Sequence, residues 1–359
     1  MNQRMQRVLA AMEKAGLEQM VVADSGAIYY LTGKRIEPGE RMLALYLNQN
    51  GKHKLVLNEL FPLHGDPEGM EVLFYNDTQD PVALLAQYTD PNKALGVDKV
   101  WPARFLLPLM ERGGASRFCN SSSIIDHIRA VKDADEIEKM RRASQLNDQA
   151  MGELQKCVAQ GMSEKEAAEE LARIYQRLGA NGSFSFEPII GYGAHGADPH
   201  YGDHGDNRPQ PGQSIVLDMG CKHDGYCSDM TRTVFCGAPT EEQKRVYDIV
   251  LEANLRGIAA ARPGARYCDV DAAARDYITS KGYGDRFLHR TGHSIGLECH
   301  EFGDVSSVNQ DVLEPGMIFS VEPGVYLAGD FGVRIEDLVL VTEDGCEVLN
   351  RFPKELVQL

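Results

Sequence analysis

The sequence predicts a two-domain protein, with an α/β domain over residues 1–125 and an α+β domain over residues 126–359 that contains an internal pseudo-twofold repeat. Two observations lead to this fold class. In the first part of the chain, short apolar runs alternate with helical patterns, as expected of strands interleaved with helices. In the second part, glycine and acidic positions recur at matching intervals. A chain of 359 residues is long enough for two separate cores.

The first domain is expected to open with an amphipathic helix in MNQRMQRVLAAMEKAGLEQM, whose charges run throughout and do not suit a signal peptide with an apolar centre. The alternating segments that follow are QMVVADS, MLALYLNQNGKHKLVLNEL, EVLFYND, ALGVDK and RFLLPLMERG. The Asn-Gly pair inside the second of these predicts a β-hairpin. These segments predict an α/β domain. It contains no cluster of candidate catalytic residues.

The second domain begins where the pattern changes near residue 125. The segment IIDHIRAVKDADEIEKMRRAS opens a long charged helix, predicted from Asp135 to about Val158. After this helix come two glycines, Gly161 and Gly179, and the later pair Gly264 and Gly282 has the same separation. This equal spacing, with helical patterns around each glycine, predicts that the domain is built twice.

The acidic residues follow the same repeat. The interval from Gly161 to Asp218 matches the interval from Gly264 to Glu322 to within a single position. In IVLDMGCKHDGYCSDMT, residues 215–231, a hairpin turning at residues 223–224 would place Asp218 opposite Asp229. Like charges in directly opposed positions are destabilising, so something positive is expected between them.

A second hairpin is predicted in MIFSVEPGVYLAGDFGVRIEDLVLV, where Glu322 and Glu336 would lie on facing strands. Two hairpins related by a pseudo-twofold axis would gather four carboxylates, which cannot share one cavity without cations. His293, between Gly292 and Gly296, is a candidate imidazole ligand, and the two glycines would let backbone approach a ligand closely.

Such a ligand set fits two ions that activate a bridging water, which predicts metal-assisted hydrolysis. Carboxylate oxygens suit Mg²⁺ or Mn²⁺, and an added imidazole shifts the preference toward Mn²⁺, Fe²⁺, Co²⁺ or Zn²⁺. The competing reading is that each acid is an ordinary solvated strand residue, but all of them follow or interrupt apolar runs. His195 and His204 are left unassigned as surface or loop residues.

Composition excludes several partners. The net charge of −16, without a basic run, makes nucleic acid an unsuitable partner. No apolar stretch is long enough to predict a membrane span. The eight cysteines are scattered without a C-x-x-C pair, as in reduced thiols of an intracellular protein, so a cytoplasmic location is expected.

At these residues the sequence resembles the pita-bread metallopeptidases, the family of prolidase, aminopeptidase P and methionine aminopeptidase. The matching segments are VLDMG, SDMTRT, HRTGHSIGLECHE, FSVEPGVY and VRIEDLVLV, with DPHYG upstream. Residues 1–125, including MVVADSGAIYYLTG, resemble the creatinase/prolidase N-terminal domain. Methionine aminopeptidases lack that domain, so the resemblance is to the prolidase and aminopeptidase P branch, with a pita-bread catalytic domain over residues 126–359.

The resemblance implies a role for each motif residue. The ligands of a dinuclear site would be Asp218, Asp229, His293, Glu322 and Glu336, with Asp229 and Glu336 bridging two divalent ions. Mn²⁺ is the expected metal, with Co²⁺, Zn²⁺ or Fe²⁺ as alternatives. Glu322 would also act as general acid and base. His200 would bond the substrate near the scissile amide or stabilise the tetrahedral intermediate, His300 would hold the substrate carbonyl, and Arg334 would support the ligands.

The resemblance also implies hydrolysis of Xaa-Pro bonds, in dipeptides or at the N-termini of longer peptides, by a homodimer. An Xaa-Pro bond is a tertiary amide and has no N–H. A site that cleaves it therefore cannot depend on a hydrogen bond donated by that amide nitrogen. Prolidases commonly place a basic residue four positions after the residue equivalent to His300, whereas this chain has Asp304. That departure puts strict dipeptidase action in doubt. The alternatives are a creatinase-like amidinohydrolase, which works without metal, and a non-catalytic pita-bread module that binds peptide or protein.

Overall fold

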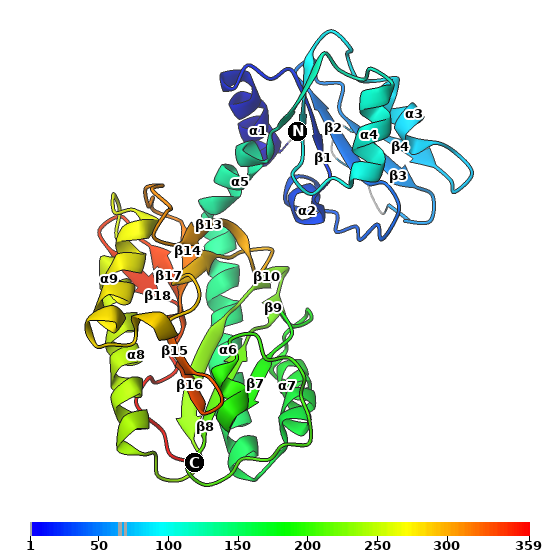
Figure 1. The fold of residues 1–359 in the computed structure, drawn as a ribbon. Coiled ribbons are helices and arrows are strands. Elements are labelled where there is room, and N and C mark those ends of the chain that lie inside the picture. The colour runs from blue at the N-terminus through cyan, green and yellow to red at the C-terminus, as the bar shows by residue number, and fades with distance from the viewer. Residues whose placement is uncertain (1, 64–66, 68–69) are drawn as a thin grey trace. The chain divides into compact units, whose positions relative to one another are not determined.

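The computed structural model describes residues 2–63, 67 and 70–359. The chain forms two compact units, Met1–Arg129 and Ala130–Leu359. They are joined through helix α5 (Ser122–Ala130), which begins close to the boundary expected near residue 125 and extends to the division between the units (Figure 1). Within the described residues, no helix has both the length and the apolar character needed to cross a membrane.

The first unit is an α/β domain around one mixed sheet. In the part of this unit that the structure describes, six strands lie in the order β4-β3-β2-β1-β5-β6. Their bounds are β1 Gln19–Val22, β2 Ala44–Asn48, β3 Lys54–Asn58, β4 Glu71–Tyr75, β5 Ala94–Val97 and β6 Arg117–Asn120. The helices besides α5 are α1 Gln3–Lys14, α2 Ser25–Thr32, α3 Pro81–Ala86 and α4 Ala103–Glu111. Strands β2 and β3 pair in antiparallel register, which confirms the hairpin predicted around Asn-Gly.

The N-terminal helix is also confirmed. Asn2 caps α1 by accepting a hydrogen bond from the backbone of Met5, and the helix buries Met5, Val8 and Met12. These apolar residues recur at the spacing of one helix face, so the burial of that face explains why the segment is helical. The polar residues between them stay on the other face.

The second unit contains two pairs of long helices, which Figure 1 shows on either side of the strands. The pairs are α6 (Ala134–Ala159) with α7 (Glu164–Leu178), and α8 (Glu241–Ala260) with α9 (Tyr267–Ser280). In each pair the predicted glycines lie in the left-handed region, with φ of 87° and 83° at Gly161 and Gly179 and 81° and 87° at Gly264 and Gly282. A left-handed residue at a helix end is most easily supplied by glycine, and this requirement accounts for the repeat spacing.

The strands of the second unit divide in the same way. The first half has the sheet β11-β8-β7 with the short ribbon β9-β10, and the second half has the sheet β13-β12-β14-β17-β18 with the hairpin β15-β16. The first-half strands are β7 Ile189–Tyr192, β8 Ser214–Met219, β9 Lys222–His223, β10 Tyr226–Cys227 and β11 Met230–Phe235. The second-half strands are β12 Gly292–Ser294, β13 Glu301–Val305, β14 Ile318–Val321, β15 Gly324–Leu327, β16 Phe331–Arg334, β17 Asp337–Val341 and β18 Cys346–Val348. Two short 3₁₀ helices, Gly193–Ala197 and Gly284–Arg286, complete the unit.

The predicted register of the first hairpin is wrong. Asp218 pairs with Thr231, not with Asp229, because the turn is made by Asp224 and Gly225. Both turn residues have positive φ, 49° and 85°, as a two-residue turn of type I′ requires. His223, expected in the turn, instead belongs to strand β9 together with Lys222. Asp229 lies in the two-residue gap between β10 and β11.

The register of the second hairpin agrees with the prediction. Val321 pairs with Asp337 on one side and Gly324 pairs with Arg334 on the other. The same register places Glu322 opposite Glu336 in the gap between the two ladders. Glu322 and Glu336 therefore lie in a break between two strand ladders. The paired strands on each side of the break hold their backbone in place.

Candidate metal centre and active site

All of the site residues predicted from the sequence lie around one cavity of about 560 Å³ in the second unit. They are Asp218, Asp229, His293, Glu322, Glu336, His200, His300 and Arg334. Sequence positions more than a hundred residues apart are therefore brought together by the two halves of the domain. Among the other lining residues are His289, Arg290, Cys299, Tyr201 and Glu187.

Backbone hydrogen bonds hold two of the four carboxylates, Glu322 within the second half of the domain and Glu336 against the first half. The amide of Glu322 donates to the carbonyl of Thr291 at 2.8 Å, and the amide of Glu336 donates to the carbonyl of Thr231 at 3.1 Å. The hydroxyl of Thr231 also donates to Glu336 Oε2 at 2.6 Å. Thr231, which pairs with Asp218, thus links the two hairpins and holds Glu336 beside the strand that carries Asp218.

His293 lies between two of the acids. Its Nε2 is 3.6 Å from Asp229 Oδ2 and 3.4 Å from Glu322 Oε1. Its Nδ1 is 3.2 Å from the backbone carbonyl of Ser294, which fits a tautomer with the proton on Nδ1. The remaining nitrogen, Nε2, is then free to accept or to bind a metal ion.

Gly292 and Gly296, the glycines on either side of His293, are both closely packed against other parts of the protein. A Cβ at Gly292 would lie 1.9 Å from the carbonyl oxygen of Ser320, so glycine is required because β12 packs closely on β14. At Gly296, a Cβ would lie 2.8 Å from the carboxylate of Glu301. Close packing within the protein is enough to require glycine at both positions. The prediction that these glycines let the backbone approach a ligand stays a prediction.

Burial and mutual repulsion dominate the electrostatics of the cluster. Burial, aided by Asp218 and Glu322, raises the pKa of Asp229 well above its usual range. Burial and the neighbouring acids do the same to the pKa of Glu336. Burial raises the pKa of Glu322 to about 7, with Arg334 opposing the shift and Asp218 adding to it. In contrast, burial lowers the pKa of His293 to about 3, so this imidazole is neutral near pH 7. The cluster therefore favours protons or cations.

The donor set fits divalent metal ions. Within the described part of the chain, Asp218 Oδ1 and Asp229 Oδ1 are buried without any hydrogen-bond partner. Ligand atoms of Asp229, His293 and Glu336 all lie within 4.8 Å of one another. Buried carboxylate oxygens without a partner are costly unless a cation neutralises them, and a neutral imidazole beside them is a metal ligand of the ordinary kind.

A chain of hydrogen bonds extends from Asp218 to residues that were not predicted. Arg334 donates from Nη2 to Asp218 Oδ2 at 2.6 Å and from Nη1 to the hydroxyl of Tyr326 at 2.7 Å. This hydroxyl lies 2.8 Å from Nε2 of His289, whose Nδ1 is 2.7 Å from the carbonyl of Arg290. Burial, with Arg334 adding to it, lowers the pKa of His289 to about 3, so Nδ1 donates to the carbonyl and Nε2 accepts from Tyr326.

The loop that carries His200 is anchored by a buried acid, Glu164. This carboxylate is fully buried at the start of α7 and accepts from the hydroxyl of Tyr201 at 3.0 Å and from the backbone amide of Tyr192 at 2.9 Å. Nδ1 of His195, left unassigned from the sequence, bonds Glu164 Oε1 at 2.9 Å. His195 therefore has a structural contact next to the site, while His200 is exposed at the cavity wall.

Cys299 and His300 form the other wall of the cavity. The thiol of Cys299 lies 3.6 Å from Asp229 Oδ2, and burial raises the thiol pKa, so the sulfur donates to the carboxylate. The rings of His293 and His300 meet edge to face with centroids 4.2 Å apart. His300 is exposed and His293 is buried, so the pair connects the floor of the cavity with its opening.

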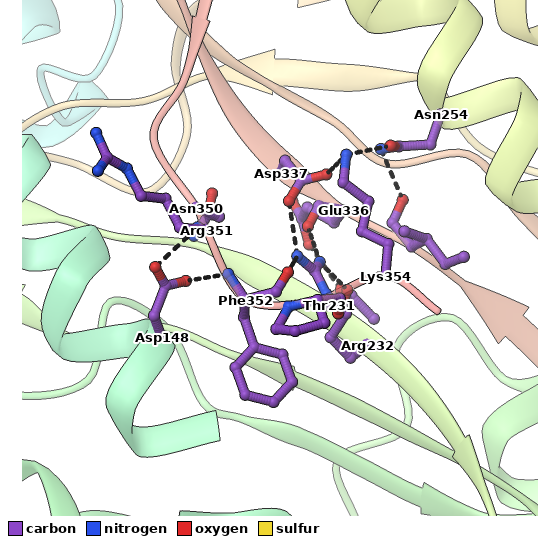
Figure 2. Close-up of polar contacts among 12 residues, drawn as sticks. Asp148, Thr231, Arg232, Asn254, Glu336, Asp337, Asn350, Arg351, Phe352 and Lys354 are labelled. Atoms are coloured by element: carbon purple, nitrogen blue, oxygen red, sulfur yellow. Dashed lines mark hydrogen bonds and ion pairs between the residues drawn. The ribbon is translucent and has the colours of Figure 1, made fainter. Parts of the chain in front are cut away.

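A second polar network lies behind the carboxylates, and Figure 2 shows its contacts. Arg232 is 2% exposed and donates to five oxygens, two of which are the carbonyls of Thr231 and Glu336 at 2.9 and 2.7 Å. The others are Asp337 Oδ1 and the carbonyls of Phe352 and Pro353, at 2.8, 2.7 and 3.0 Å. The C-terminal segment is thereby tied to the backbone of a site residue.

Sequence reasoning missed several of these supporting residues. His289 lies in the quoted segment HRTGHSIGLECHE and Arg232 in SDMTRT, so both stood next to predicted residues. Tyr326 follows Glu322 closely in FSVEPGVY. Proximity in the chain was the only available signal, because their partners lie on other elements. Glu164 had no comparable signal, since it resembles any acid in the first turn of a helix.

Comparisons with known proteins find matches to both parts of the chain. The sequence pattern described as metallopeptidase family M24 matches residues 138–343, and that of the creatinase/prolidase N-terminal domain matches residues 4–131. An uncharacterized peptidase of Staphylococcus aureus is 38% identical over 329 residues, which cover 91% of this chain and 93% of the relative.

Two solved structures are similar over nearly the whole chain. A prolidase from Thermococcus sibiricus is 33% identical with a TM-score of 0.93, and the match covers 100% of both chains. An X-Pro aminopeptidase from Thermotoga maritima is 30% identical with a TM-score of 0.80, covering 98% of this chain and 100% of the other. TM-scores of this size over nearly the full length show that both structures share the fold described above.

Proposed function

Because the chain belongs to metallopeptidase family M24, we propose that it hydrolyses Xaa-Pro peptide bonds, in dipeptides or at the N-termini of longer peptides, with a dinuclear metal site. The observation that carries the proposal is the cavity lined by four carboxylates and His293, in which two buried carboxylate oxygens have no partner among the described residues. The two solved structures compared above are named as a prolidase and an X-Pro aminopeptidase.

The proposed ligands are Asp218, Asp229, His293, Glu322 and Glu336, with Asp229 and Glu336 bridging. Mn²⁺ is the proposed metal because carboxylate oxygens outnumber nitrogen, and Co²⁺, Zn²⁺ and Fe²⁺ are the competitors. When bound, a pair of such ions supplies an activated water and a Lewis acid for the scissile carbonyl. A creatinase-like amidinohydrolase needs no metal, so the unpaired carboxylate oxygens do not favour that alternative.

Glu322 is proposed to move the proton. A carboxylate in this position would accept a proton from the attacking water and return it to the leaving nitrogen. The hydroxyl of Ser320 donates to Glu322 Oε1 at 3.0 Å and fixes the carboxylate for this role. The leaving proline nitrogen needs that proton, because it departs as a neutral amine and not as an anion.

His200 and His300 are proposed to bind the substrate. Both are exposed on the wall of the cavity, within the same lining as the carboxylates. Burial and the neighbouring Arg290 lower the pKa of His300, so it is neutral at pH 7 and able to donate one hydrogen bond to a carbonyl oxygen. Arg334 holds Asp218 and does not need to touch the substrate.

The ion pair between Arg290 and Asp304 favours peptides longer than two residues. Arg290 lines the cavity, and its guanidinium forms an ion pair with Asp304, the residue at which the sequence departs from the prolidase pattern. The carboxylate of a dipeptide would have to compete with Asp304 for this cation. A longer peptide carries no charge directly after the proline and avoids that competition.

The test is hydrolysis of Ala-Pro and Ala-Pro-Ala by metal-stripped protein, with and without added Mn²⁺, and with Ala-Ala-Ala as the control. We expect Mn²⁺-dependent cleavage of the proline peptides, faster for the tripeptide. Faster cleavage of the dipeptide would show that Asp304 does not weaken dipeptide binding. If Mn²⁺ gives no cleavage, Co²⁺, Zn²⁺ and Fe²⁺ are tested in turn, and cleavage of neither proline peptide with any of the four metals would contradict the proposed substrate.

The remaining parts of the proposal concern assembly and compartment. We propose a homodimer, as implied by the resemblance to this branch of the family, and light scattering of the purified protein tests it. A cytoplasmic location is supported by the eight cysteines, all of which are free thiols in the structure. No nucleic acid is proposed as a partner, since the net charge is −16.

A further inference from the structure

The cavity contains a second group of potential metal ligands besides the acids. His293, Cys299 and His300 each offer a ligand atom, and these atoms all lie within 4.8 Å of one another. All three side chains line the same cavity. His293 is buried, Cys299 is partly buried and His300 is exposed, so the group extends from the carboxylates to the solvent.

The chemistry of this group differs from that of the acids. Two imidazoles and one thiol form a soft ligand set, which suits Zn²⁺ or Cd²⁺, whereas carboxylates suit Mn²⁺. The proposed peptidase site uses His293 with Asp229 and Glu336, a group that also fits within 4.8 Å. His293 belongs to both groups, and with Nδ1 facing the carbonyl of Ser294 only one of its nitrogens is free.

We propose that His293, Cys299 and His300 form a thiophilic metal site that shares His293 with the carboxylate site, and that Zn²⁺ or Cd²⁺ bound there inhibits the peptidase. One imidazole nitrogen binds one ion at a time, so an ion held by the soft group removes His293 from the carboxylate group. The same ion occupies His300, which is proposed to hold the substrate. The inhibition rests on the proposed function, but the binding does not.

Binding of the soft ion replaces the present contact of the thiol. The sulfur now donates to Asp229 Oδ2 at 3.6 Å. When a divalent ion binds, the sulfur–hydrogen bond is exchanged for a sulfur–metal bond, the proton leaves to solvent, and no oxidation occurs. Asp229 loses a weak donor and remains available to cations.

The test is titration of Mn²⁺-loaded protein with Cd²⁺, followed by the ultraviolet sulfur-to-cadmium charge-transfer absorption and, in parallel, by the remaining peptidase activity. The variants are Cys299→Ala and Cys299→Val, and Cys157→Ser is the matched control because Cys157 is a partly buried thiol on helix α6, which contributes no residue to the cavity. Activity is expressed relative to the same protein without Cd²⁺, so that any change in basal rate cancels.

We expect the wild-type protein and Cys157→Ser to give the same high-affinity absorption band and the same inhibition. Both Cys299 variants should lose that band and bind Cd²⁺ at least about tenfold more weakly, as expected on the loss of a ligand. An unchanged band and unchanged inhibition in the Cys299 variants would overturn the proposal. If no peptide substrate is cleaved, the absorption band still decides whether the soft site exists, so failure of the proposed function is distinguished from failure of this site.

Discussion

Arg334 and Asp218 form a buried ion pair in which the guanidinium donates to only one of the two carboxylate oxygens. The donor Nη2 lies 2.6 Å from Oδ2, the side chains are 3% and 10% exposed, and Oδ1 has no partner within the described chain. The pair thus leaves one oxygen of Asp218 available for a cation. Neighbouring Tyr326 and Asp218 keep the pKa of Arg334 high although burial opposes it, so the arginine stays charged.

We expect Arg334→Gln to lower the free energy of unfolding of the metal-free protein by about 3–5 kcal/mol, because removing one partner leaves a buried charge uncompensated. Urea denaturation in chelator measures the change. The matched control is Arg208→Gln, since Arg208 pairs with Glu166 at a similar 2.8 Å but both side chains are about half exposed. That variant should lose no more than about 1 kcal/mol. Equal losses in the two variants would contradict the role of burial.

Glu322→Gln should abolish turnover while the fold is retained. The amide cannot accept a proton, and loss of a general acid and base typically costs about 10²–10⁴-fold in rate. The measurement is kcat with Mn²⁺ added to saturation, together with circular dichroism and metal content. Glu187→Gln is the control, because Glu187 lines the same cavity as an exposed acid. Near-normal activity of Glu322→Gln would remove this residue from the mechanism.

Asp229→Asn should reduce the number of bound divalent ions from two to one or none, because a bridging carboxylate holds both ions at once. Metal analysis by mass spectrometry after equilibrium dialysis gives the stoichiometry. Thr233 is buried in the neighbouring strand and bonds Arg334, so Thr233→Val is a control for disturbance of the hairpin without loss of a ligand. Two ions per chain retained by Asp229→Asn would contradict the bridging assignment.

The sequence was most informative about the acids and least informative about what supports them. Asp218 and Glu322 each follow an apolar strand and recur at nearly the same interval, so their convergence followed from local pattern and repeat spacing. The register of the first hairpin was missed although Asp224-Gly225 carries the usual signal for a two-residue turn. The predicted turn lies one residue too early in the chain. Moving a two-residue turn by one residue changes the partner of each strand residue by two positions, so Asp218 pairs with Thr231 and not with Asp229.

Contacts between distant segments could not be predicted in this way. Arg232 bonds carbonyls of Phe352 and Pro353, which lie about 120 residues further along the chain. Any arginine in a strand could instead be exposed, and nothing in SDMTRT separates the two cases. Likewise, Glu164 could have been a solvated helix acid. Their burial is decided by tertiary packing, which one sequence does not reveal.

The buried acids predict that the metal-free protein loses stability as the pH rises from 6.5 to 8. Glu322 has a folded pKa of about 7 against an ordinary value of 4.5, so within this range the folded state holds a proton that the unfolded state has lost. Asp229 and Glu336 are shifted in the same direction. Stability from a raised pKa is fully present below the unfolded value and is lost as the pH passes the folded value.

The histidines oppose this trend at lower pH and in the first part of the chosen range. His289 and His293 have folded pKa values of about 3 against 6.5, so their contribution rises with pH and is nearly complete by about pH 7.5, whereas the raised pKa values of Asp229 and Glu336 lower the stability across the whole range. Guanidinium denaturation at pH 6.5 and 8 in chelator tests the prediction. Glu322→Gln should flatten the loss, and saturating Mn²⁺ should remove it because cations replace the protons. Rising stability of the metal-free wild type over this range would contradict the prediction.

Arg232 should control metal affinity although it is not a ligand. Its donors hold the carbonyls of Thr231 and Glu336, the two residues that are themselves joined by the 2.6 Å hydroxyl–carboxylate bond (Figure 2). Lysine keeps the charge but lacks the planar fork that reaches several oxygens. We therefore expect Arg232→Lys to weaken Mn²⁺ binding about 10- to 100-fold, the usual effect of losing a group that orients a ligand.

Isothermal titration calorimetry with Mn²⁺, at a temperature where circular dichroism shows the variant folded, separates this effect from loss of the fold. Arg266→Lys is the matched control, since Arg266 forms an ion pair with Asp269 in which both side chains are more than 40% exposed. The control should bind Mn²⁺ as the wild type does. A folded Arg232→Lys protein with wild-type affinity would show that the network only holds the C-terminal segment. Weaker binding in that folded protein would show that the positions of Thr231 and Glu336 depend on the arginine behind them.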